Sequence, residues 1–87
     1  MHESGMIEEL IAKVEEAARK HSARRATAVE VSIGELAAIS AEHLREHFLL
    51  ASKGTLAEGA ELRVRDAQAG PPRDPFGVYL ESVELET

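Results

Sequence analysis

Apolar residues near the start of the chain recur at the spacing of an amphipathic helix. Over residues 6–21 they fall at i, i+3, i+4 and i+7, and the set is Met6, Ile7, Leu10, Ile11, Val14, Ala17 and Ala18. Charged residues occupy most of the remaining positions, so one face should pack on a core. Ser4 is the expected N-cap, because its hydroxyl can accept a hydrogen bond from a first-turn amide. The pattern predicts a long helix over residues 6–21.

Three later stretches alternate apolar and polar residues instead, as half-buried strands do. Val29, Val31 and Ile33 share one face of residues 27–33, and Gly34 ends that stretch. Residues 60–65 alternate in the same way. Residues 78–85 alternate too, but their apolar parity changes near Ser82, which predicts a strand interrupted by a β-bulge.

A second helix is predicted between the first two strands. Ser40 can cap it, Leu44 and Phe48 lie on one face, and it should run to about residue 52. Gly54 follows where a helix commonly ends in a left-handed residue. Residues 67–77 contain Gly-Pro-Pro and Asp-Pro sequences, which predict a loop.

The predicted order is therefore helix, strand, helix, strand, strand over a single domain of residues 1–87. This order predicts an α+β fold of two layers, in which two helices cover a small three-stranded mixed sheet. The strand order stays open. The second helix permits a right-handed parallel crossover, whereas the short loop 67–77 favours an antiparallel hairpin.

Composition narrows the classes of function. The 87 residues include 10 Lys plus Arg against 16 Asp plus Glu, for a net charge of -6, with one Tyr, two Phe and no Trp. Nucleic-acid binding is not expected, because phosphate neutralisation and base stacking are both poorly supplied. The absence of cysteine excludes disulfides, CxxC zinc sites and thiol catalysis. No stretch approaches the ~20 apolar residues of a membrane span, and no signal peptide is visible, so a cytoplasmic protein without membrane contact is expected.

Met1, His2 and Glu3 carry the chemistry that points to a metal. The α-amino group of Met1, the backbone nitrogen of His2 and its imidazole Nδ1 can enclose a divalent ion in fused chelate rings. A planar set of nitrogens suits Ni(II) and Cu(II), with copper favoured by affinity alone. Glu3 could add its backbone nitrogen or its carboxylate, or only a negative charge near a helix N-terminus. The alternative is an exposed terminal histidine without a function.

His43 and His47 form a second, weaker candidate metal site. With Glu46 they match the H-x-x-E-H spacing of some zinc peptidases. A catalytic zinc also needs a third protein ligand and a cleft for substrate, and a chain of 87 residues has little room for one. We therefore expect two partly exposed helical histidines and no enzyme, with an adventitious metal pair as the alternative.

Four segments together resemble the HypA (HybF) family of nickel-insertion accessory proteins in hydrogenase maturation. They are residues 1–3 (MHE), 31–36 (VSIGEL), 53–62 (KGTLAEGAEL) and 82–86 (SVELE). The resemblance spans nearly the whole chain apart from residues 67–77. It implies a metallochaperone that holds Ni(II) at the N-terminus, and either the GTPase HypB or a hydrogenase large subunit as partner.

The chain departs from the family at two places. Family members insert a zinc module with two CxxC pairs between the last two strands, whereas residues 67–77 contain no cysteine, so no structural zinc is expected. Ser4 and Gly5 replace the Leu or Met and the Ser that usually follow the first three residues. The alternative is thus a zinc-less interaction module that no longer transfers metal, with homo-oligomer or partner contacts through an apolar sheet edge or helix face.

Overall fold

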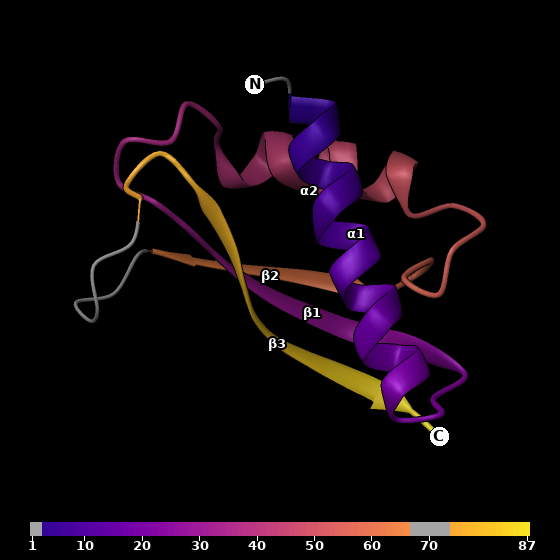
Figure 1. Ribbon diagram of the computed structural model, residues 1–87. Coiled ribbons are helices and arrows are strands. Elements are labelled where there is room, and N and C mark those ends of the chain that lie inside the picture. The colour runs from indigo at the N-terminus through magenta and orange to yellow at the C-terminus, as the bar shows by residue number, and fades with distance from the viewer. Residues whose placement is uncertain (1–2, 67–73) are drawn as a thin grey trace.

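The computed structural model describes residues 3–66 and 74–87 and contains two helices and three strands (Figure 1). In chain order these are α1 (Glu3–Lys20), β1 (Arg25–Ile33), α2 (Ala41–Ala51), β2 (Glu61–Asp66) and β3 (Val78–Glu86). The element order and the α+β class agree with the sequence prediction. No helix among the described residues is long and apolar enough to cross a membrane.

The three strands form one sheet in the order β2-β1-β3, with β1 parallel to β2 and antiparallel to β3. The parallel crossover through α2 is therefore present, and the hairpin between β2 and β3 is not, because β1 lies between them. Ile33 at the end of β1 pairs with both Asp66 and Val78. The end of β2 and the start of β3 therefore lie on either side of β1, two strand spacings or about 10 Å apart.

The predicted bulge in the last strand is confirmed. Glu30 pairs with Ser82 and Val31 pairs with Leu80, which leaves Glu81 as the extra residue of β3. The extra residue shifts the alternation of side chains along β3 by one position. Leu80 and Val83, which are three positions apart, therefore both pack against the same core. The parity change in the sequence is therefore the local signal of this irregularity.

The helix ends agree with the sequence in α2 and differ in α1. Ser40 caps α2, and its hydroxyl accepts a hydrogen bond of 3.1 Å from the backbone N–H of His43. Gly54 has the expected left-handed conformation, with φ of +79°. The prediction that Ser4 is an N-cap is wrong, because α1 already begins at Glu3 and Ser4 lies inside its first turn. An acidic residue is favourable in the first turn of a helix, so the helix can extend through Glu3.

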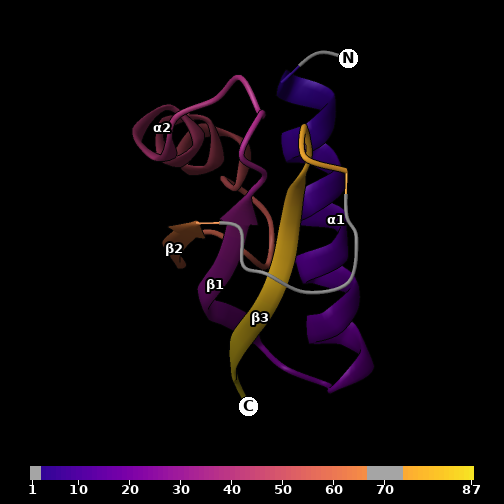
Figure 2. The same cartoon turned by 90° about the vertical axis from the view of Figure 1, so that its left-hand side faces the viewer.

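Both helices contribute to one apolar core on one face of the sheet. Figures 1 and 2 show α1 lying along β1 and β3, while α2 lies near β2 and crosses the first half of α1. The core side chains are Ile7, Leu10, Ile11, Val14, Ala26, Val29, Val31, Ile39, Leu44, Phe48, Ala57 and Leu62. Leu44 has no exposed surface and joins α2 to the start of α1. The first turns of α1 are therefore anchored by packing.

Gly34 is required by a close approach of two chain segments. A Cβ atom on Gly34 would lie 2.6 Å from the carbonyl carbon of Pro75, and that backbone is held by a 2.9 Å hydrogen bond from the N–H of Leu36 to the oxygen of Pro75. Replacing Gly34 with Ala should lower the free energy of unfolding by about 1–3 kcal/mol, the usual cost of overpacking. Urea unfolding of G34A measures this. Gly5 has open space around it, so G5A is the matched control, and equal stability of the two variants would contradict the prediction.

Candidate metal centre

The start of α1 confines the candidate N-terminal donors to one end of the helical layer. Met1, His2 and the side chain of Glu3 lie outside the part of the chain that the structure describes, and the backbone of Glu3 begins α1. Two extended residues reach at most about 7 Å, so the nitrogens of Met1 and His2 must stay near the first turn of α1. That turn is fixed by Ile7, of which only 1% is exposed.

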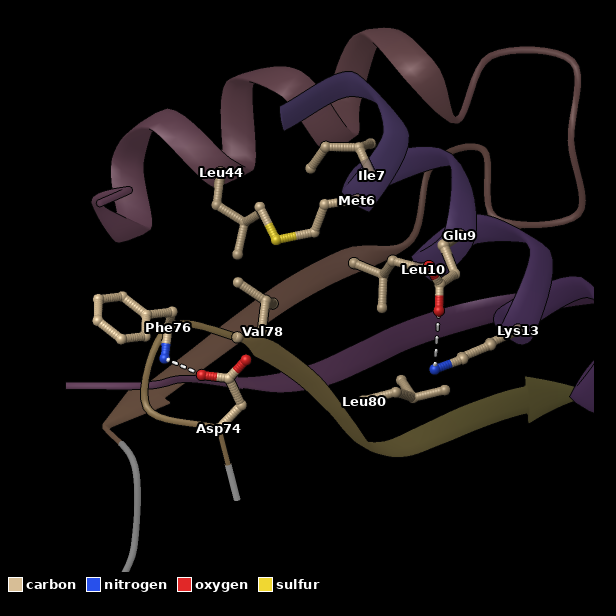
Figure 3. A pocket seen from close by; sticks show the side chains of 11 residues that line it. Met6, Ile7, Glu9, Leu10, Lys13, Leu44, Asp74, Phe76, Val78 and Leu80 are labelled. Carbon is tan, nitrogen blue, oxygen red and sulfur yellow. Dashed lines mark hydrogen bonds and ion pairs between the residues drawn. The ribbon is translucent and has the colours of Figure 1, made fainter. Parts of the chain in front are cut away.

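A hollow of about 310 Å³ lies below this end of α1, between both helices and the segment leading into β3. Figure 3 shows Met6 and Leu44 at one side of it and Phe76 and Val78 at the other. Its walls are mainly apolar, and its polar groups are already engaged. Lys13 pairs with Glu9 at 3.5 Å, and the carboxylate of Asp74 accepts a 2.9 Å hydrogen bond from the backbone of Phe76.

Sequence reasoning missed this hollow, because it treated residues 67–77 as an undifferentiated loop. The contribution of Phe76 depends on β3 pairing beside β1, which periodicity does not show. An aromatic residue, Phe76, close to the start of the apolar positions of β3 is the local signal.

The structure brings His43 and His47 together on the exposed surface of α2. Their Nε2 atoms are 2.8 Å apart, their ring centroids are 4.5 Å apart, and the ring planes are tilted by 50°. The i, i+4 spacing places both rings on one side of the helix. Leu44 and Phe48, each one position further along, are buried and fix the rotation of α2. The H-x-x-E-H spacing thus places both imidazole rings side by side on the surface of α2.

The geometry does not support a catalytic zinc at this pair. Within residues 3–66 and 74–87, no group of three or more His, Cys, Asp or Glu side chains lies close enough to hold a metal ion. A catalytic zinc normally has three protein ligands. The described residues therefore provide a two-ligand site only.

The face of the sheet opposite the helices carries a network of ion pairs. Arg65 lies between Glu30 and Glu81, at 3.6 and 3.7 Å, and Arg63 lies between Glu61 and Glu84. The hydrogen bond from Arg63 to Glu84, and to a smaller extent the one to Glu61, raises the pKa of the Arg63 guanidinium. The Ser32 hydroxyl also donates to Glu81, at 2.5 Å.

The strand register brings these charges together, so the sequence alone could not pair them. Each arginine in the network faces acidic side chains, and its charge is balanced locally. The Arg63 pairs are exposed and contribute little to stability, whereas the Glu81 side chain, which Arg65 and Ser32 contact, is only 15% exposed. The network therefore forms a polar outer surface of the sheet rather than a binding site.

A protein-family model matches residues 1–70 of the chain. The model described as "Hydrogenase/urease nickel incorporation, metallochaperone, hypA" matches residues 1–70, which include Met1, His2 and Glu3. The chain belongs to the HypA family. The family resemblance predicted from the sequence is thereby confirmed.

Individual relatives agree with this assignment. The hydrogenase maturation factor HypA of Xanthobacter autotrophicus is 45% identical over 64 residues, which cover 74% of this chain and 57% of the relative. HypA of Archaeoglobus fulgidus is 44% identical, with 74% and 58% covered. HypA of Nitrosospira multiformis is 33% identical over the whole chain and 70% of its own length. The chain thus spans less than two thirds of the length of the Xanthobacter and Archaeoglobus relatives.

Two solved HypA structures share the fold. The solution structure of the Ni metallochaperone HypA from Helicobacter pylori superposes with a TM-score of 0.82 and 23% identity, covering 99% of this chain and 98% of that one. A second structure, titled "Solution structure of HypA protein", has a TM-score of 0.75 and 23% identity, covering 98% and 96%. At this identity the likeness establishes the architecture alone.

Proposed function

We propose that this chain is a nickel-binding, metallochaperone-like accessory protein for the maturation of a nickel enzyme, a hydrogenase. The observation that carries the proposal is the family match that starts at residue 1 and so includes Met1, His2 and Glu3. The anchored start of α1 supports the proposal, because Met1 and His2 are joined covalently to the backbone of Glu3, where that helix begins.

In this proposal Ni(II) is cargo, held by the amine of Met1, the backbone nitrogen of His2 and Nδ1 of His2. Late transition metals accept such a planar nitrogen set, and the metal displaces the amide proton of His2. Glu3 supplies the fourth position through its backbone or its carboxylate.

The recipient is proposed from the family description. A nickel-incorporation protein needs a partner that accepts the ion, and the GTPase HypB or a hydrogenase large subunit fills that role by resemblance. The segment 67–77 contains no cysteine, so the chain would bind its partner without a CxxC zinc module in that segment.

Ni(II) affinity at the N-terminus should rise with pH. A protonated amine or imidazole cannot bind the metal, and their reference pKa values are about 7.7–8.0 and about 6.5. Raising the pH from about 6 to about 8 should therefore tighten binding by about a hundredfold or more, as competing protons are removed. Titrations of Ni(II) at several pH values measure this. An affinity that does not change over that range would contradict binding through the amine and the imidazole.

The functional test is hydrogenase maturation in the native host at limiting nickel. Cells that carry H2A should lose most hydrogenase activity, and added nickel should restore part of it. H21A removes an exposed histidine in the turn after α1 and should leave maturation intact. If H2A cells mature hydrogenase as well as wild-type cells, the chain acts instead as an interaction module without metal transfer.

A further inference from the structure

We propose that His43 and His47 form a second binding site for a divalent metal ion of the Ni(II) or Cu(II) type. The site lies on α2 and does not depend on the N-terminal donors, so it goes beyond the proposed function.

The separation of the two nitrogens fits a particular coordination geometry. Imidazole nitrogens bind divalent metals at about 2.0–2.1 Å. The two Nε2 atoms are 2.8 Å apart. An ion at that bond length from both would bind them at an angle of roughly 85–90°, as in the square-planar or tetragonal sites of Ni(II) and Cu(II). A tetrahedral zinc site would require a separation of about 3.3 Å at the same bond length.

The chelate is held on a rigid element. The cap at Ser40 accepts its hydrogen bond from the backbone of His43 itself, and the buried side chains of Leu44 and Phe48 follow the two histidines directly. Arg45 ties the same helix to β2 through a 3.2 Å hydrogen bond to the oxygen of Leu62. The helix is thus fixed at its start and along its buried face, so little backbone order has to be created when an ion binds.

Without metal, the two rings form a hydrogen bond. One Nε2–H donates to the other Nε2, and the tautomers decide which ring is the donor. A metal that binds both Nε2 atoms requires both neutral rings to carry their proton on Nδ1. The donor ring therefore changes tautomer, its proton moving from Nε2 to Nδ1 through solvent, with no net release of a proton. The two nitrogen atoms are therefore already close together, and water molecules would complete the coordination of the ion.

The pair also lies at the same end of the molecule as the start of α1. His47 lines a surface hollow of about 260 Å³ together with Ile7 and Glu8 of α1 and Leu50 of α2. The two proposed sites would therefore be neighbours, and their tests must keep them apart.

Ni(II) titration in an H2A background separates the α2 site from the N-terminal one. H2A should still bind one equivalent, and H2A with H43Q and H47Q should bind at least about tenfold more weakly, because both imidazole ligands of the site are lost. H2A with H21Q is the matched control and should bind as H2A does. Cu(II) should bind more tightly than Ni(II) at the same pair.

Ring signals in NMR spectra locate the ion directly. Added Ni(II) should change the imidazole signals of His43 and His47 in H2A before those of His21. Circular dichroism checks that H43Q and H47Q keep the helix. Unchanged affinity in the double-Gln variant, or equal effects on all three histidines, would overturn the proposal. Neither result would affect Ni(II) binding by the unmodified N-terminus, so the two proposals can fail separately.

Discussion

Two residues, Gly-Ser, added before Met1 are expected to weaken Ni(II) binding at the N-terminus by about a hundredfold or more. The extension converts the amine of Met1 into an amide and moves the new amine away from His2. Loss of a supporting group around a metal costs roughly 10–100-fold, so loss of a direct ligand should reach at least the upper end. Calorimetric titration of the extended and unextended chains measures the difference.

The same Gly-Ser extension after Thr87 is the matched control. β3 ends beside the start of β1, close to the last turn of α1. The first turn of α1 lies at the other end of this 18-residue helix, which is about 27 Å long. A C-terminal extension should therefore leave the affinity unchanged. Both chains should carry H43Q and H47Q, so that only the N-terminal donors are measured. Equal affinity for the two extended chains would contradict the role of the Met1 amine.

Replacing Leu44 with Ala is expected to lower the free energy of unfolding by about 3–5 kcal/mol. Leu44 is fully buried where α2 meets α1, and its removal leaves a cavity against Met6 and Ile7 (Figure 3). A domain of this size has a total stability of roughly 5–10 kcal/mol, so L44A should be close to unfolding. Urea or thermal unfolding measures the change.

Leu50 gives the matched control on the same helix. Its side chain is 67% exposed, so L50A makes the same chemical change without opening the core. The expected effect is within about 0.5 kcal/mol. If L44A and L50A had equal stability, α2 would not be packed against α1 as described.

The fold was predictable wherever the signal was local. The spacing of apolar residues identified α1, the hydroxyl of Ser40 identified the start of α2, and the parity change near Ser82 identified the bulge. The expected cap at Ser4 was wrong, because several residues near a helix start can serve in its first turn. Propensity alone does not decide among them.

Strand order and the ion pairs were not predictable, because both depend on which strands become neighbours. Arg65 approaches Glu30 and Glu81 only once β1 lies between β2 and β3. The two candidate metal centres differ in the same way, one following from the local sequence and the other from the folded structure. Adjacent donors at Met1 and His2 follow from covalent structure, whereas the 2.8 Å approach of His43 and His47 requires the side-chain conformations.

The most direct test of the N-terminal site is Ni(II) titration of the untagged chain and its H2A counterpart, both carrying H43Q and H47Q. The account predicts one equivalent of Ni(II) bound by the chain with His2 and at least about a hundredfold weaker binding by H2A. Equal affinity in the two proteins, or negligible binding by both, would contradict it.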